Sequence, residues 1–254
     1  MFDQFSRYMI CYSLIHNYFF WRHGHGPAPT LAALQRAVEA SPRQTAGLVA
    51  SLKAGRLVIA EPAASDLRIR LLRPSAEMIG EIGRSVLAFV VAADRLDGVG
   101  AAGDRLTGEA DALGDLLYRS AAHVRTHGTL IHPFPRVLFF AMRDCGYLLL
   151  CKVMQAHYGQ TVPQAAPGPH LSYRALAEAL QVSPAHIGNL LGEAAREGWF
   201  VIGGRGKLEA IDPTLVEEFE LWSSTQMAHY RWLGNQTLTF LAAPLSLGAN
   251  DRRG

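Results

Sequence analysis

Two short segments of the chain carry side chains suited to hydrogen bonding with the edges of nucleic-acid bases. These side chains are Ser41, Arg43, Gln44 and Thr45 in the first segment, and Ser183, His186 and Asn189 in the second. Arginine pairs with guanine edges, and glutamine and asparagine pair with adenine edges, when a helix carries them into the major groove. Each segment opens with Ser-Pro, a pair that is typical of a helix start. The sequence therefore predicts two helices with base-matching groups in their first turns.

The two segments belong to an internal repeat. Residues 30–48 align with residues 172–190 at a constant offset, with six identical residues. In each copy a hydroxyl side chain caps a short helix, a turn ends in Ser-Pro, and a second helix runs to a glycine. In the first copy Gln44 stands three residues after Ser41, which predicts a capping box and gives Gln44 a role apart from base contact.

A β-hairpin is predicted after each pair of helices. In the first copy residues 57–60 turn into residues 67–72, and in the second copy residues 199–202 turn into residues 207–211. Glycine- or proline-containing turns between β-branched runs are typical of hairpins. The order of helix, turn, helix and hairpin is that of a winged helix-turn-helix, and the chain is predicted to contain two of them.

The two predicted hairpin tips differ in charge. The second tip presents Arg205 and Lys207 on a glycine-rich turn, which suits contact with phosphates or the minor groove. The first tip carries acidic residues, with Arg68 and Arg70 beyond them. Because the two units differ, the sequence predicts an asymmetric or imperfectly palindromic DNA site.

Long amphipathic helices are expected to flank and join the two units. They are predicted at residues 4–22, 75–96, 104–127 and 136–158, and from residue 213 onward. The predicted fold class is mainly α with small β-hairpin wings, a tandem winged helix-turn-helix joined by long helices. The predicted domains are residues 1–100 for the first unit, residues 101–130 for a connecting helix and loop, and residues 131–254 for the second unit.

Residues 41–58 and 65–75 together resemble the recognition helix and wing of MarR-type transcriptional regulators. In that family an acidic residue and an arginine two positions later stabilise the wing, which implies this role for Asp66 and Arg68. Family members are homodimers of shorter chains, so the resemblance implies a fused pseudo-dimer that is monomeric or dimerises further. It also implies sequence-specific binding of double-stranded DNA in bacterial transcription regulation.

The resemblance implies two further features of the flanking helices. A small aromatic or phenolic effector binds between such helices and the winged unit in related regulators. The candidate pocket residues here are Phe19, Trp21, His132, Phe139 and Trp222. Cys11, with Tyr8 and Tyr12 nearby, resembles the reactive cysteine of organic-hydroperoxide sensors. Reactivity requires a lowered thiol pKa and access to solvent, and the alternative interpretation is a small buried side chain.

Composition narrows the class of protein. With 254 residues, 49% of them hydrophobic and 18% charged, the chain is not disordered. The net charge of +2 requires any basic surface to be local. Three cysteines without metal-finger spacing predict a reducing cytoplasm. The apolar stretches 8–21 and 137–151 are interrupted by polar residues and fall short of the ~20 apolar residues of a membrane span.

No cofactor, metal or enzymatic activity is predicted. Residues 98–103 match the glycine spacing of a dinucleotide-binding turn, but an amphipathic helix precedes them where the motif requires a strand. His16, His23 and His25 have no carboxylate or thiolate at helical ligand spacing.

Two alternatives to a transcriptional regulator stay open. One is a tandem winged-helix scaffold that binds protein, as in chromosome condensation, and the other is a plasmid replication initiator. The modest net charge and the acidic first hairpin tip favour the scaffold, whereas Arg43 together with Arg205 and Lys207 favours DNA.

Overall fold

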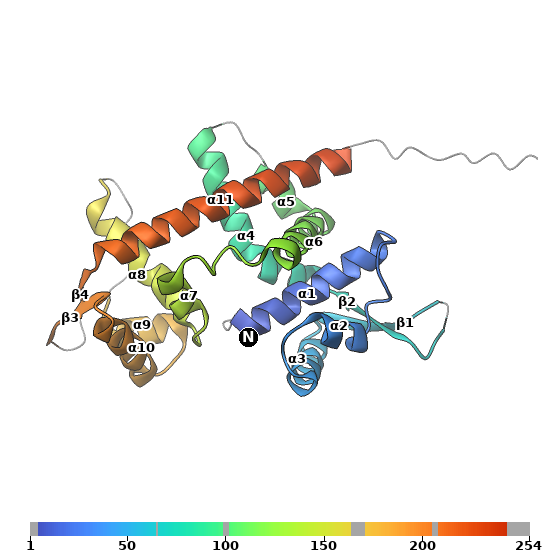
Figure 1. Ribbon diagram of the computed structural model, residues 1–254, viewed down its shortest axis with the longest axis horizontal. Helices are drawn as coiled ribbons and strands as arrows, with labels where there is room; N and C mark the ends of the chain where they lie inside the picture. The colour runs from blue at the N-terminus through green and yellow to red at the C-terminus, as the bar shows by residue number, and fades with distance from the viewer. Residues whose placement is uncertain (1–4, 65, 99–101, 164–170, 205–207, 243–254) are drawn as a thin grey trace, which may run out of the picture.

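The computed structural model describes residues 5–64, 66–98, 102–163, 171–204 and 208–242 (Figure 1). This part of the chain is mainly helical and contains two small antiparallel β-hairpins, which confirms the predicted helical class with small hairpins. Each hairpin is a separate two-stranded sheet that follows a pair of short helices. The order of helix, helix and hairpin therefore occurs twice among these residues.

The first half of the chain begins with a long helix and continues through the first helix pair and hairpin. Its elements are α1 (Phe5–Arg22), α2 (Leu31–Ala37), α3 (Pro42–Ala54), β1 (Val58–Pro62), β2 (Arg70–Pro74) and α4 (Ala76–Asp97). Thr30, Ser41 and Ser75 cap α2, α3 and α4 through their side-chain oxygens. The predicted capping box between Ser41 and Gln44 is confirmed, with both reciprocal hydrogen bonds present.

The region predicted as one helix over residues 104–127 contains two. They are α5 (Ala102–Gly108) and α6 (Ala110–His127), and Glu109 between them has an extended backbone with φ −132° and ψ 102°. Gly108 precedes the break, and glycine weakens a helix because it gains more conformational freedom than other residues when the helix opens. Apolar periodicity continues through the break and therefore does not reveal it in the sequence.

The second half contains the repeat of the helix pair and hairpin and ends in the longest helix. Its elements are α7 (Pro135–Ala141), α8 (Gly146–Thr161), α9 (Tyr173–Leu180), α10 (Pro184–Arg196), β3 (Phe200–Ile202), β4 (Leu208–Ile211) and α11 (Pro213–Ala242). Ser172 and Ser183 cap α9 and α10, as predicted.

The helix predicted at residues 136–158 is also divided, into α7 and α8. Cys145 between them has a φ of 49°, in the left-handed region that side chains rarely adopt. Gly146 follows against the end of α7, where a Cβ atom would lie 2.3 Å from the carbonyl oxygen of Phe140. Arg143 connects the segment between α7 and α8 to two helices. Its guanidinium donates to the Phe139 carbonyl oxygen on α7 at 2.8 Å and pairs with Glu193 on α10.

Both hairpins lie close to their predicted positions. Strand β1 pairs with β2 from Val58 opposite Pro74 to Pro62 opposite Arg70, so the second strand begins three residues later than the sequence predicts. Strand β2 starts later because the turn before it is wider. In this turn the Asp66 carboxylate accepts a hydrogen bond from the backbone N–H of Arg68 at 2.9 Å. Strand β3 pairs with β4, with Phe200 opposite Ile211.

Two hydrophobic clusters form the core, and α11 belongs to both. Leu215 and Trp222 in its first half pack with α7 to α10, whereas Leu233 and Leu238 in its second half pack with α1, α4 and α6. In Figure 1 this helix (orange to red) crosses the whole molecule, and it packs along α4. The helices that follow the two hairpins, α4 and α11, thus join the halves. The division at residues 100 and 131 stays a prediction.

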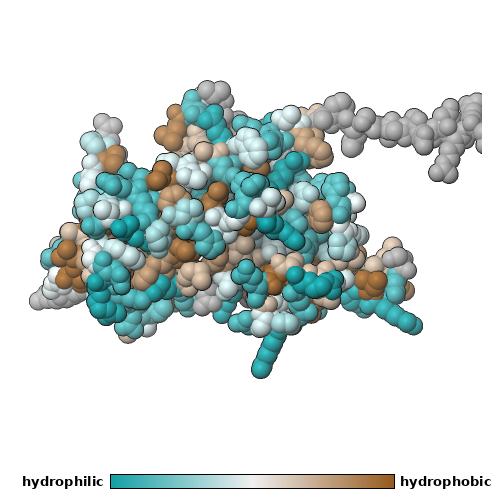
Figure 2. Space-filling model, viewed as in Figure 1, coloured by the Kyte–Doolittle hydropathy of each residue, from teal (hydrophilic) through white to brown (hydrophobic). Residues whose placement is uncertain are grey.

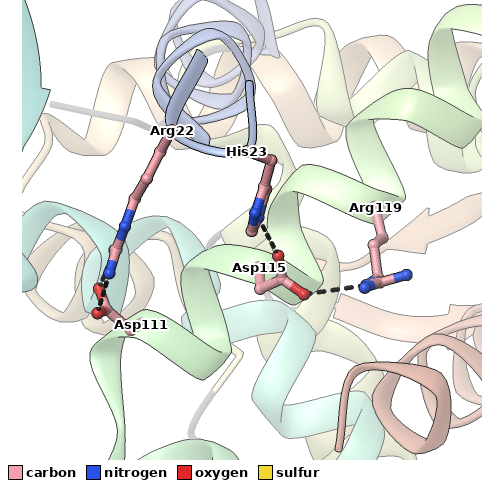
Figure 3. A network of polar contacts seen from close by, with 5 residues as sticks. All are labelled: Arg22, His23, Asp111, Asp115 and Arg119. Atoms are coloured by element: carbon pink, nitrogen blue, oxygen red, sulfur yellow. Dashed lines mark hydrogen bonds and ion pairs between the residues drawn. The ribbon is translucent and has the colours of Figure 1, made fainter. Parts of the chain in front are cut away.

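A network of polar contacts fixes the end of α1 against α6 (Figure 3). The Asp115 carboxylate lies 2.7 Å from Nε2 of His23 and 3.0 Å from Nε of Arg119, and only 3% of its side chain is exposed. On the surface nearby, Arg22 forms a bidentate ion pair with Asp111, with N–O distances of 2.8 and 2.9 Å. The same face of α6 therefore carries two carboxylates, Asp115 buried and Asp111 exposed, and each of them is paired with basic side chains.

His229 is expected to make stability fall as the pH falls from about 6.5 towards 4. Its ring on α11 lies 4.6 Å from that of His123 on α6. Burial, and then the neighbouring His123, lower the pKa of His229 to about 4 from the ordinary 6.5. Below pH 6.5 the unfolded chain takes up the proton that the folded protein does not, so acid favours unfolding. Urea denaturation at pH 7.5, 6 and 5 measures this loss.

The His229→Gln variant should lose less stability over this pH range than the natural protein. His25→Gln, which replaces an exposed histidine, is the matched control for the loss of an imidazole. An equal pH dependence in the natural protein and His229→Gln would show that another group causes the effect.

Candidate nucleic-acid interface

The first turn of α3 offers one free charged side chain. Arg43 is exposed, and within the described part of the chain it forms no hydrogen bond or ion pair. Ser41 and Gln44 are also exposed, but their side chains are held in the capping box, with the Gln44 N–H donating to Ser41 Oγ at 3.2 Å. Arg43 is therefore the side chain of this turn that is available to a partner.

The structure corrects the prediction for Thr45. This side chain is fully buried, and its hydroxyl donates to the carbonyl oxygen of Ser41 at 3.1 Å. It lies on the inner face of α3 with Val49 and Leu52, at the four- and three-residue spacing of one helix face. Thr45 is thus a core residue that cannot contact a nucleic acid.

The start of α10, residues 183–189, carries no lysine or arginine. Ser183 is exposed, and its hydroxyl caps the helix by accepting from the N–H of His186 at 3.1 Å. The His186 ring is partly buried, and its Nε2 lies 3.0 Å from the Asp144 carbonyl oxygen, which ties α10 to the connection between α7 and α8. Asn189 is exposed, and among the described residues its side chain has no hydrogen-bond partner.

The first hairpin adds exposed cations. Arg68 and Arg70 are both exposed. Asp66 contacts the backbone N–H of Arg68 and so shapes the turn that carries it, while Glu61 is engaged by Arg73 across the strands at 2.7 Å. The Arg73 guanidinium lowers the pKa of the Glu61 carboxyl. Arg205 and Lys207 lie outside the described residues.

Charge is distributed unevenly over the two helix pairs. Residues 31–57 carry four basic side chains, Arg36, Arg43, Lys53 and Arg56, and one acidic side chain, Glu39. Residues 173–199 carry two basic side chains, Arg174 and Arg196, and three acidic ones, Glu178, Glu193 and Glu197. An anionic backbone is attracted to clustered lysine and arginine. The first helix pair is therefore the better surface for a polyanion.

The two helix pairs lie on the same edge of the molecule. In Figure 1, α2 and α3 and the pair α9 and α10 both lie along the lower edge, and the two hairpins extend to opposite sides. Hydrophilic side chains cover much of this edge in the same view (Figure 2). The exposed first turns of α3 and α10 are thus carried by similar units at the two ends of one edge.

A cavity of about 430 Å³ lies where the two halves meet, and only one of the five predicted effector residues lines it. This residue is Trp222; the other lining residues come from α1, α4, α6, α7, α8, α11 and the loop at 129–131. Phe19 is buried against α6, and Trp21 lies on the surface. His132 is exposed, and Phe139 packs on Trp199. Phe19 and Trp21 do not line this cavity because it contacts the first half of α1 and they lie near its end.

Cys11 does not have the properties of a peroxide sensor. Its side chain is fully buried, and burial raises the pKa of the thiol to about 12. Because the thiolate is the reactive form, this shift is opposite to the one that reactivity requires. Cys11 is a core side chain of α1.

Other classes of site receive no support from the described residues. Within the ranges given above, no group of three or more histidine, cysteine, aspartate or glutamate residues has a metal-binding arrangement. No helix in the same ranges combines the length and apolarity that crossing a membrane requires. In comparisons with protein-family models, curated proteins and solved structures, nothing matches this chain.

Proposed function

We propose that the protein is a sequence-specific, double-stranded-DNA-binding transcriptional regulator of the tandem winged helix-turn-helix type. In this proposal α3 and α10 each enter a major groove, and the hairpins after them act as wings. The observation that carries the proposal is the repeated unit of two helices and a hairpin, with α3 and α10 on one edge of the molecule (Figure 1) and exposed residues at the start of both helices. A recognition helix reads bases through its N-terminal side chains.

The two units have different roles in this proposal. Arg43 reads a base edge, for which guanine is the preferred partner of arginine, and Asn189 reads adenine in the other half-site. Arg68 and Arg70 contact the DNA backbone beside the first unit, as do Arg205 and Lys207 beside the second. Two major grooves on one face of DNA lie about one turn, ~10 base pairs, apart. The unequal units favour an imperfectly palindromic site.

The salt dependence of binding to a random-sequence duplex tests the proposal. A DNA-binding protein that contacts several phosphates loses affinity steeply between 50 and 200 mM salt. We expect such a slope by fluorescence anisotropy, and we expect Arg205→Ala to reduce the logarithmic slope by about 1. Arg105→Ala removes the same charge from α5, away from the lower edge in Figure 1, and should leave the slope unchanged. An absence of duplex binding at 50 mM salt would overturn the proposal.

A protein-binding scaffold is the second candidate, and one observation favours it. The first hairpin exposes two large apolar side chains, with Ile59 36% exposed and Leu67 72% exposed. Exposed apolar residues gathered on one element are typical of protein interfaces. A scaffold would show no affinity for duplex at any salt concentration, so the same titration separates the two candidates. Neither candidate includes catalysis.

A further inference from the structure

The two repeat units end their second helix in the same way but with different residues. Arg56 follows the C-terminal cap of α3, and Gly198 follows that of α10, both in the left-handed region with φ of 58° and 80°. In each unit the N–H of this residue donates to the carbonyl oxygen three positions earlier at 3.0 Å. The N–H of the next residue donates to the carbonyl oxygen five positions earlier, at 2.9 Å after α3 and 3.0 Å after α10. The two positions are therefore equivalent in the fold.

The side chain of Arg56 makes this helix end less favourable. Glycine is the usual residue at such a position because it has no Cβ atom. In the left-handed region the Cβ atom of any other residue lies too close to the following carbonyl oxygen. Gly198 shows that the same turn forms without a side chain. Strained backbone positions of this kind are concentrated at functional sites, so the Arg56 side chain is expected to act outside the turn.

No group in the described part of the chain holds the Arg56 side chain. It is exposed, and among the described residues its guanidinium has no hydrogen bond or ion pair. Lys53 in the last turn of α3 is exposed and unpaired in the same sense. The corresponding residues of the second unit, Ala195 and Gly198, are uncharged. The helix dipole favours a cation at this end of α3, but Lys53 already provides one without strain.

The length of α3 carries this end towards the border of a major groove. The helix has 13 residues and is therefore about 20 Å long at 1.5 Å per residue, whereas the groove is about 12 Å wide. With the first turn of α3 at the base edges, the last turn and Arg56 lie beside the sugar-phosphate backbone. The two unpaired cations therefore lie where a phosphate group is the nearest anion.

We propose that Arg56, with Lys53 beside it, forms a phosphate-binding site at the C-terminal end of α3. This inference rests on the proposed function, because its ligand is a phosphodiester of the bound duplex. The planar guanidinium donates two parallel hydrogen bonds to phosphate oxygens, and Lys53 adds positive charge. The second unit has no such site, so the first unit provides more of the affinity for the DNA backbone.

Two substitutions of Arg56 separate its charge from its strain. Arg56→Ala removes the charge and keeps a Cβ atom in the left-handed region, whereas Arg56→Gly removes both. By anisotropy titration with a random-sequence duplex, both variants should reduce the logarithmic salt slope by about 1 and weaken binding equally for all sequences. In thermal denaturation Arg56→Gly should melt about 2–4 °C above Arg56→Ala, because only glycine relieves the strain.

Gln181→Gly is the matched control for strain without charge. Gln181 ends α9 with a φ of 57° and is exposed and neutral. Its replacement by glycine should raise the melting temperature by a similar amount and leave the salt slope unchanged.

Gly198→Arg is the reciprocal variant in the second unit. A Cβ atom at Gly198 would meet no described atom within 4 Å beyond its chain neighbours, so only the left-handed backbone opposes the substitution. We expect a salt slope that is steeper by about 1 and a lower melting temperature.

The possible results separate this inference from the proposed function. Duplex binding with an unchanged salt slope in Arg56→Ala and Arg56→Gly would overturn the phosphate site and leave the proposed function in place. A lower melting temperature of Arg56→Ala with that unchanged slope would assign Arg56 to the stability of α3. Equal melting temperatures of the two variants would contradict the strain on which the inference depends. No duplex binding by the natural protein would remove the proposed function and the phosphate site together.

Discussion

The Arg43→Ala variant is expected to bind a selected operator duplex about 10- to 100-fold more weakly than the natural protein. A bidentate contact between arginine and a guanine edge contributes about 1–3 kcal/mol of discrimination, and each 1.4 kcal/mol is a factor of ten. Arg43 is exposed and unpaired at the start of α3, whereas Ser41 and Gln44 beside it serve the capping box. Selection from a random duplex pool, followed by anisotropy titration, measures the effect.

The pattern of the loss distinguishes a base contact from a phosphate contact. A base contact predicts relaxed preference at one base pair, whereas a phosphate contact predicts a uniform loss and a shallower salt slope. Arg36→Ala, on the exposed surface of α2, is the matched control for charge. If Arg43→Ala weakens binding to all sequences equally, Arg43 does not read bases.

The repeat supplies a complementary variant. The position that corresponds to Arg43 in the second unit is Ala185, which is exposed in the first turn of α10. Ala185→Arg should add a guanine preference in the weaker half-site and make the selected sequence more symmetric. Selection that returns the same asymmetric sequence would show that α10 does not present this turn to a groove.

The Asp115→Ala variant is expected to lower the free energy of unfolding by about 2–3 kcal/mol. Removing one partner of a buried ion pair typically costs 3–5 kcal/mol, and the cost is smaller here because His23 and Arg119 are about one-quarter exposed and regain some hydration. The variant also removes the acceptor that joins the end of α1 to α6 (Figure 3). Urea denaturation measures the change.

Asp111→Ala provides the control, four residues earlier on the same helix. The Arg22 and Asp111 side chains are 45% and 69% exposed, and exposed pairs contribute about 0.2–1 kcal/mol. The contribution of the Arg22–Asp111 pair to the free energy of unfolding should also decrease at high salt concentration. Equal destabilisation by the two substitutions would mean that burial of Asp115 does not determine its contribution.

Local signals in the sequence predicted the helix starts and the hairpins well. Hydroxyl caps at Thr30, Ser41, Ser172 and Ser183 act over three residues, so a single chain segment contains the whole interaction. The breaks at Glu109 and at residues 142–145 were not predictable in the same way. The second break depends on the close contact of Gly146 with the Phe140 carbonyl, which arises only when α7 and α8 have folded together.

The sequence predicted which residue types form the candidate site but not which of their side chains are exposed. Arg43 and Thr45 both belong to a polar first turn, and only the rotation of α3 against the core decides that Arg43 is exposed and Thr45 is buried. The same applies to the cavity. Tyr12 and Gln226 lie more than 200 positions apart in the chain, and no local pattern shows that their side chains face the same space.

The position of α11 has a consequence for biosynthesis. Leu233 and Leu238 complete the apolar cluster that begins with Ile10 in α1. A ribosome must therefore translate at least as far as Leu238 before α1 can contact all the members of this cluster. During that interval the part of the chain already synthesised exposes apolar surface where α11 later packs. We expect chaperones that bind nascent chains to associate with this apolar surface until α11 has emerged and packed against it.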